Sequence, residues 1–471
     1  MRILRAELDK GMIKEEVFTM AGHAAPGAGG LVMEYLAGDP GKPSPLILAT
    51  GLFAGTRLAG GGILAMGWIS PEAEASLCVF GGDAASRLTD HGIKTVIIEG
   101  TSPMWVYLHI SEDGRAELRD ASDLTGKGTA RLTRILRERH GERSSVISVG
   151  PLGEEGSSAS CVVCTDPDPS LPPRQAAGGG MGRAFGERRL LAVVTEHSPR
   201  PFRIPFDTAA ATRFDELCSV INAAIAKDTL TGEMLPLYGP LTDGLEGSPW
   251  RELLPESSGG WEKREKAAWR ENMISSGGLL TIPCVPGCTV RCSNIAKERR
   301  GNAISTGLDH EAAFMFGSLT GIFGLKDILA IDSLCADAGC DLLSAGEILG
   351  ELSRQGALGF PDPSGAKRLI RGMLSGTGAA HRALSGYGNA ASRLPGSGIK
   401  RGHFPGRGEL SASCFMCPLP WRALMKDAPA LRALTEMCSL MGWEAAEGFP
   451  ESLEEALGSM ESRIRQRLSE G

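Results

Sequence analysis

The sequence predicts an α+β protein in which a β-rich first part precedes a mostly helical remainder. Short apolar runs, separated by Gly, Pro and Asp, fill the first 200 residues. After Pro205, longer segments repeat apolar residues at spacings of three and four. Chains longer than about 250–300 residues usually divide into domains. We therefore expect three domains in these 471 residues: 1–200, 201–345 and 346–471.

The strand predictions come first along the chain. Each run is rich in Val, Ile, Leu or Thr and is bounded by turn-forming residues. The predicted strands are Arg2–Leu8, Leu46–Thr50, Thr95–Glu99, Trp105–Ile110, Val146–Val149 and Leu190–Val194. Cys161-Val-Val-Cys164 has the spacing of a redox motif, but its flanks do not resemble a thioredoxin unit. We expect these two thiols on a strand.

The helix predictions follow in the second part. Apolar residues at helical spacing predict the helices Phe214–Ala226, Glu311–Phe323, Lys326–Gly339, Ala345–Gln355 and Leu453–Leu468. Two stretches rich in Gly, Pro and Ser, Gly239–Trp261 and Ser385–Ser411, are predicted to be long loops.

Composition excludes several classes of protein. The chain carries 49 Lys and Arg against 56 Asp and Glu, a net charge of −7, so it lacks the basic surplus of a nucleic-acid-binding protein. The N-terminus lacks the apolar core of a signal peptide, and no apolar run is long enough to span a membrane. We therefore expect a cytoplasmic protein whose 12 cysteines stay reduced, available for metals or catalysis.

The strongest motif is Cys284-Val-Pro-Gly-Cys288-Thr-Val-Arg-Cys292, with Cys414 and Cys417 far downstream. Three clustered thiols and one distant thiol are typical of a four-iron cluster, in which each iron takes one thiolate. Zinc would accept the same four sulfurs, although zinc ligands more often come as two separated pairs. A third interpretation is that the cysteines are small buried apolar residues.

Two weaker signals accompany it. The loop Ala176–Gly182, Ala-Ala-Gly-Gly-Gly-Met-Gly, has the glycines that let backbone amides approach a phosphate. It shows neither a strand before it nor a helix after it, so a plain turn is the alternative. Glu311 follows Asp309, which is suited to cap the predicted helix. A carboxylate in a first helical turn also satisfies the helix dipole without any other role.

Taken in chain order, several segments resemble the aldehyde:ferredoxin oxidoreductase family, whose members bind tungsten, or molybdenum, through two pterins beside one four-iron cluster. The order of these segments carries the resemblance. They are Ala49–Thr56, Gly92–Gly100, Gly150–Glu154, Ala176–Gly182, Asp309–Ser318, Cys335–Asp341 and Met441–Trp443.

The resemblance implies a β-rich N-terminal domain that forms a saddle for the pterins, followed by two mostly helical domains, the second shortened. It implies that Glu311 moves a proton as a small aldehyde becomes an acid, with electrons leaving to ferredoxin or a similar carrier. It assigns a [4Fe-4S] cluster to Cys284, Cys288, Cys292 and Cys417, with Cys414 as the competitor for the fourth position, and places Gly178, Gly179, Gly180, Gly339 and Asp341 in cofactor binding.

The sequence departs from the family pattern at several positions that would bind the phosphate of the pterin. The family's Gly-Arg-Gly-Gly loop reads Gly178-Gly-Gly-Met181 here, and the first Asp of its Asp-x-x-Gly-x-Asp turn is Ala336. These changes remove charges and donors that a dianionic phosphate needs. Two functions remain open: an aldehyde oxidoreductase, or a divergent paralogue that has lost the tungsten-pterin site and serves as an electron-transfer or scaffold subunit. A homodimer or a partner subunit is compatible with both.

Overall fold

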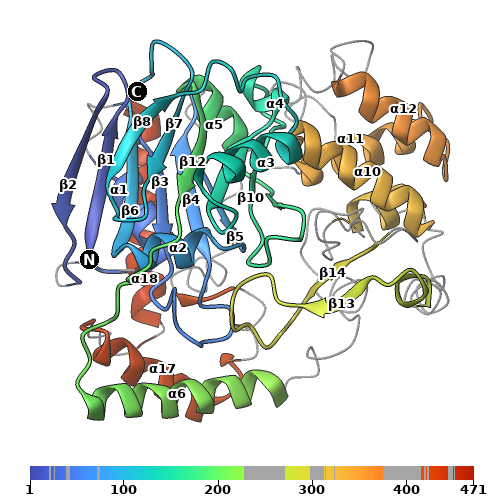
Figure 1. Cartoon of the computed structure of the whole chain (residues 1–471). Helices are drawn as coiled ribbons and strands as arrows, with labels where there is room; N and C mark the ends of the chain where they lie inside the picture. Colours follow the sequence, from blue (N-terminus) through green and yellow to red (C-terminus); the bar gives the residue numbers. More distant parts are fainter. Residues whose placement is uncertain are drawn as a thin grey trace.

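The computed structural model describes residues 1–20, 23–25, 27–38, 43–71, 75–227, 271–297, 312, 314–322, 324–374, 415–417, 421, 424–443, 449 and 451–470. Two six-stranded sheets are followed by a mostly helical remainder, which confirms the α+β prediction (Figure 1). None of the described helices is long and apolar enough to cross a membrane.

The first sheet has the strand order β2-β1-β6-β3-β4-β5. Its strands are β1 (Arg2–Glu7), β2 (Met12–Val17), β3 (Leu46–Thr50), β4 (Leu64–Ile69), β5 (Ala75–Phe80) and β6 (Ile93–Glu99). The centre of the sheet is buried on both faces. Ile47 and Ala49 of β3 face one apolar core, whereas Leu46 and Leu48 face another. Because side chains alternate along a strand, double burial explains the unbroken apolar run in the sequence.

The second sheet has the order β11-β10-β9-β12-β7-β8. Its strands are β7 (Val106–Ile110), β8 (Ala116–Asp120), β9 (Ser145–Val149), β10 (Val162–Cys164), β11 (Arg174–Ala176) and β12 (Leu190–Thr195). Apolar side chains of the two sheets share one core. All six predicted strands are confirmed. Cys164 lies on β10 as expected, whereas Cys161 directly precedes this strand, and both are buried.

Five helices interrupt this β-rich part: α1 (Ala28–Leu36), α2 (Ala84–Asp90), α3 (Thr129–His140), α4 (Pro151–Glu154) and α5 (Met181–Glu187). The second core, on the other face of the first sheet, joins α1 to α6 (Thr208–Lys227), α17 (Ala428–Leu440) and α18 (Glu451–Glu470). Helices α6 and α17 lie side by side (Figure 1). The C-terminal helices therefore pack on the N-terminal sheet.

A third core joins α10 (Leu325–Ala338), α11 (Leu342–Arg354), α12 (Pro363–Leu374) and the π-helix η4 (Phe314–Ser318). The helices predicted near α6, α10, α11 and α18 are confirmed. Of the helix predicted at residues 311–323, the structure shows the π-helical part. The two predicted long loops lie outside the described residues. The domain division stays a prediction, and α11 runs across its boundary at residue 345.

Candidate functional site

The cysteine loop connects two short antiparallel strands, β13 (Leu279–Ile282) and β14 (Ser293–Ile295). Ile282, the last residue of β13, pairs with Ser293, the first residue of β14. Cys284 therefore lies just after the end of β13, and Cys292 lies just before the start of β14. Gly287, with φ of 76°, adopts the left-handed conformation that favours glycine. Hairpin pairing therefore brings the first and last thiols of the motif to one end of the loop.

Glycines of the N-terminal part allow the cysteine loop to approach closely. The amide of Gly82 donates to the carbonyl of Cys284 at 2.8 Å. A Cβ added at Gly81 would lie 3.1 Å from the Cys284 Sγ, and one added at Gly62 would lie 3.3 Å from the Cβ of Val285. Larger residues at these positions would push the loop away from the first sheet.

Cys417 reaches the same place from the far end of the chain. Its amide donates to the carbonyl of Gly60 at 2.9 Å. The amide of the same glycine faces the thiol of Cys288. Phe415, which precedes Cys417 by two residues, shares the apolar core that contains Cys288. Gly60 therefore links the cysteine loop to the distant thiol.

Two opposing effects act on the thiol of Cys288. Burial, together with the neighbouring Cys284, raises the pKa of the Cys288 thiol to about 11. Backbone amides of Val290, Arg291 and Gly60 point at the sulfur and oppose this rise in pKa. Amides directed at a thiolate also tune the potential of an iron–sulfur cluster.

The distances between the four sulfur atoms can be compared with those of a tetrahedral zinc site. A tetrahedral zinc with Zn–S bonds of about 2.3 Å holds its sulfurs ~3.8 Å apart. Among the described residues, no three of the four thiols have Sγ atoms that all lie within 4.8 Å of one another.

The glycine loop lies between a strand and a helix that the sequence pattern did not reveal. Strand β11 ends at Ala176 and helix α5 begins at Met181, so the expectation of no flanking strand and no flanking helix is wrong. Both elements are short, which hid them in the apolar pattern. Gly178, Gly179 and Gly180 have φ of 91°, 75° and 62°, a left-handed run that L-residues with side chains rarely adopt.

This loop meets the turn after α10. The amide of Gly178 donates to Oδ2 of Asp341 at 2.5 Å. The other carboxylate oxygen caps α11 by accepting from the amides of Leu343 and Ser344. Asp341 is 1% exposed. Gly339 closes α10 in the left-handed conformation, and a Cβ there would lie 2.7 Å from the amide nitrogen of Gly150.

Strand β5 connects the two groups of predicted residues. A Cβ at Gly179 would lie 3.2 Å from the Cβ of Ser76, near the start of this strand. Gly81, just after its end, contacts Cys284. Five residues of strand span about 16 Å, which separates the glycine loop from the cysteine loop. Glu311 and Cys414 lie outside the described residues.

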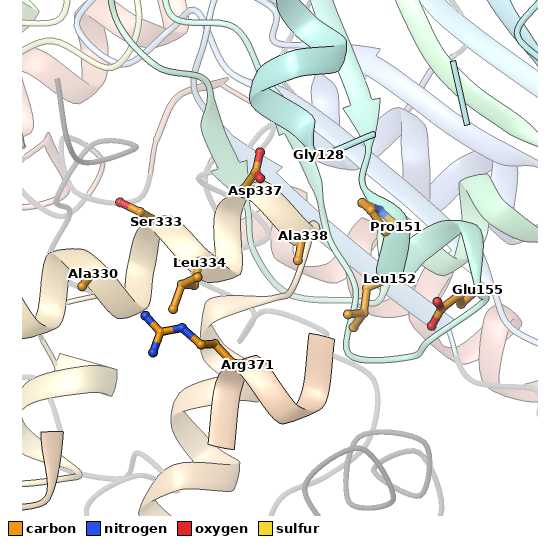
Figure 2. Close-up of a pocket in the computed structure, with 10 residues that line it drawn as sticks. All are labelled: Gly128, Pro151, Leu152, Glu155, Ala330, Ser333, Leu334, Asp337, Ala338 and Arg371. Atoms are coloured by element: carbon orange, nitrogen blue, oxygen red, sulfur yellow. The ribbon is translucent and has the colours of Figure 1, made fainter. Parts of the chain in front are cut away.

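A surface pocket of about 560 Å³ lies between the N-terminal part and the helices (Figure 2). Gly128, Leu152 and Glu155 line one side, and Asp337 and Arg371 line the other. None of the predicted site residues is among the residues that form it. Asp337 accepts from the amide of Ala130 at 3.2 Å and so caps helix α3 from another helix.

Sequence reasoning missed the contacts of Gly60, Gly81 and Asp337. Glycine-rich stretches at 51–62 and 81–82 are visible in the sequence. Their partner, the cysteine loop, becomes apparent only in three dimensions. Asp337 carries no sequence signal, because it caps a helix far away in the chain.

Both family-level comparisons agree with this architecture. Residues 3–197 match the family described as aldehyde ferredoxin oxidoreductase, N-terminal domain. Residues 245–394 match the family described as aldehyde ferredoxin oxidoreductase, domains 2 and 3.

Individual relatives are distant. The tungsten-containing aldehyde ferredoxin oxidoreductase of Pyrococcus horikoshii is 27% identical over 384 residues, which cover 77% of this chain and 60% of that protein. The same-named protein of Thermococcus kodakarensis is 26% identical, over 74% of this chain and 57% of its own length. The aliphatic sulfonate oxidoreductase, WOR-like subunit, of Pyrococcus furiosus is 25% identical, over 61% of this chain and 47% of its own.

A solved structure shares the fold. The active site complex BamBC of benzoyl coenzyme A reductase, in complex with 1,5-dienoyl-CoA, aligns with a TM-score of 0.67 at 21% identity. The alignment covers 84% of this chain and 63% of that one. This chain thus spans about 60% of the length of the curated relatives it matches. The two family matches, in the family's own domain order and together spanning most of the chain, show that this protein belongs to the aldehyde ferredoxin oxidoreductase family.

Proposed function

We propose that this chain is an oxidoreductase subunit that passes electrons through a [4Fe-4S] cluster held by Cys284, Cys288, Cys292 and Cys417. The observation that carries the proposal is Gly60, whose amide faces Cys288 and whose carbonyl binds the amide of Cys417. Cys288 lies in the apolar core, Cys284 and Cys292 pack against it, and the backbone of Cys417 reaches it through Gly60. When bound, such a cluster supplies a one-electron donor and acceptor.

The chain's own residues would hold and tune this cluster. The hairpin β13–β14 fixes Cys284 and Cys292, and glycines at 62 and 81 bring them against the first sheet. Amides of Val290 and Arg291 are directed at Cys288, and they stabilise the thiolate form. Ferredoxin or a similar one-electron carrier is the expected partner.

Oxidation of a small aldehyde to its carboxylic acid is the first candidate reaction. Relatives named tungsten-containing aldehyde ferredoxin oxidoreductase support it, and Glu311 is the expected proton carrier. The reaction needs a tungsten or molybdenum pterin centre, because the metal and its dithiolenes supply the redox chemistry.

The described residues do not fit the phosphate of that pterin. Gly178, whose amide would bind a phosphate oxygen, donates to the buried carboxylate of Asp341 instead. A carboxylate and a phosphate cannot share this amide without strong repulsion. The loop carries no arginine between residues 176 and 182. We therefore derive no step through the pterin.

This misfit favours a second candidate function, an electron-transfer or scaffold subunit without its own pterin. One relative is named a WOR-like subunit, and a solved structure with this fold is described as the active site complex BamBC. Such a subunit would assemble with a partner chain, whereas the aldehyde oxidoreductase would need a phosphate anchor elsewhere.

Anaerobic purification followed by elemental analysis for Fe, W, Mo and Zn, with a fluorescent pterin assay, separates the candidates. About four Fe with labile sulfide supports the cluster. One W or Mo with pterin in the same sample identifies the aldehyde oxidoreductase. Iron without pterin identifies the electron-transfer subunit. A sample with neither iron nor labile sulfide would overturn the proposal.

A further inference from the structure

Two buried histidines and a glutamate meet in the second sheet, away from the cysteine loop. His109 lies on β7, His140 is the last residue of α3, and Glu196 follows β12. One oxygen of Glu196, Oε1, lies 2.8 Å from Nε2 of His109 and 3.2 Å from Nδ1 of His140. One possible ligand atom from each of the three residues lies within 4.8 Å of the other two.

We propose that His109, His140 and Glu196 form a binding site for a divalent transition-metal ion of the zinc class. Two imidazoles and one carboxylate are a common ligand set for such ions, and a water would complete the tetrahedron. The site is independent of the proposed iron–sulfur cluster. It would tie the end of α3 to β7 and β12, which lie together in Figure 1.

The ligand spacing is close to what an ion requires. With metal–ligand bonds of about 2.0–2.1 Å, the ligand atoms of a tetrahedral site are ~3.3 Å apart. Both contacts of Glu196 Oε1 are within ~0.5 Å of this separation. The ligands come from three elements whose backbones are already fixed. The amide of Glu196 donates to the carbonyl of Ile110, and β7 pairs with β12 along its length.

Each ligand also has the outer partner that metal ligands have. Nδ1 of His109 lies 3.3 Å from Oε1 of Glu117, the residue opposite it on β8. Nε2 of His140 lies 3.0 Å from the hydroxyl of Tyr107, which shares a strand face with His109. Oε2 of Glu196 accepts from the amide of Glu112 at 2.9 Å. Such outer hydrogen bonds fix the tautomer and the orientation of metal ligands.

Proton accounting favours the ion over a plain hydrogen-bond network. Without a metal, His109 lies between the carboxylates of Glu117 and Glu196, so both contacts are hydrogen bonds only if the ring is an imidazolium. That cation would be 2% exposed and beside the ring of His140, with ring centroids 4.1 Å apart and ring planes tilted by 33°. With the ion on Nε2, neutral His109 donates from Nδ1 to Glu117, which also accepts from Arg119, and the carboxylate of Glu196 offsets part of the charge of the ion.

The test is zinc binding by the full-length, iron-loaded protein. Excess Zn²⁺ is added, loosely held metal is removed, and zinc and iron per chain are measured. We expect His109→Gln and His140→Gln to lose one zinc per chain relative to the parent protein, with iron unchanged. His91→Gln is the matched control, because His91 contacts the backbone carbonyl of Glu196 and leaves its carboxylate untouched. Equal zinc in the parent protein and both variants would overturn the proposal.

Zinc-edge X-ray absorption of the unmutated protein gives an answer that does not depend on a variant folding. Nitrogen and oxygen ligands at about 2.0–2.1 Å support the site, whereas a shell of sulfur ligands at about 2.3 Å assigns the zinc to cysteines and refutes it. Glu117→Gln, which changes the outer partner of His109 and also removes the ion pair with Arg119, should weaken zinc affinity about 10- to 100-fold.

Discussion

The amide of Gly178 and the carboxylate of Asp341 meet at 2.5 Å, so the glycine loop of the N-terminal part binds the turn that begins α11. This contact joins two segments that the family resemblance places in cofactor binding. It also occupies the amide that the phosphate would use. Asp341 therefore acts as an internal anion between the second sheet and the helical part.

Asp341→Ala should destabilise the protein by about 2–4 kcal/mol. The substitution removes the cap of α11, worth about 0.5–2 kcal/mol, and leaves the buried amide of Gly178 without its acceptor, at about 1–3 kcal/mol. Urea denaturation measures the change. Asp427→Ala is the control, because Asp427 caps α17 by accepting from one amide and is less buried than Asp341. We expect this control to lower the free energy of unfolding by about 1 kcal/mol. Equal losses in the two variants would contradict the bridging role.

The fourth ligand of the proposed cluster can be assigned with two matched substitutions. Cys417→Ser should lower iron and labile sulfide and bleach the visible absorbance, because Cys417 lies at the carbonyl of Gly60 beside Cys288. Cys414→Ser should leave both unchanged. Cys218→Ala, a buried thiol of α6, controls for a general effect of losing a cysteine. Loss of iron in Cys414→Ser, with full iron in Cys417→Ser, would reverse the assignment.

The cap between α10 and α3 predicts local loosening at the pocket. Removing the carboxylate with Asp337→Ala should raise hydrogen exchange at the amide of Ala130 about tenfold, which corresponds to ~1.4 kcal/mol. Gly128→Ala should act in the same direction, because its Cβ would lie 2.4 Å from both carboxylate oxygens of Asp337. Asp327→Ala, on the same helix but paired with Lys367, should leave exchange at Ala130 unchanged.

Most strands buried on both faces could be predicted from the sequence, with β4 as an exception, and strands at the edges could not. β3 is an unbroken apolar run, whereas β2 reads Met-Ile-Lys-Glu-Glu-Val and is largely exposed. β2 is held by pairing with β1 and by ion pairs such as Arg2 with Glu15. Because these contacts form between strands, they produce little alternation of apolar and polar residues within either strand.

Part of the candidate site could likewise be predicted from the sequence, and part of it could not. The cysteine loop could be found because its thiols are neighbours in sequence. His109, His140 and Glu196 come from three separate elements, so no sequence spacing reveals them. The role of Gly60 depends on Cys417, which reaches it only through packing of the C-terminal segment on the first sheet.

Asp83 predicts a pH dependence of stability that can be separated from that of other groups. It directly precedes α2, makes no side-chain capping bond to that helix, is 4% exposed, and accepts from the hydroxyls of Ser145 and Thr165 at 2.6 Å. Burial raises the pKa of Asp83 from 3.8 to about 6, although these hydroxyls and the Arg137 guanidinium act in the opposite direction. Since the folded pKa is the higher one, the folded protein binds the extra proton between these values. This stabilisation is present below pH 3.8 and is lost as the pH rises through about 6.

Asp83→Asn removes this titration, so its stability relative to the parent protein should rise by about 2–3 kcal/mol between pH 4 and pH 7.5. Urea denaturation across this range measures the difference between the two proteins, which cancels the groups they share. In the surface control Asp113→Asn, hydrogen bonds from Ser111 lower the pKa of the aspartate, so the same comparison should show a smaller change of opposite sign. A difference between Asp83→Asn and the parent protein that stays constant with pH would mean that Asp83 remains ionised in the folded protein throughout this range.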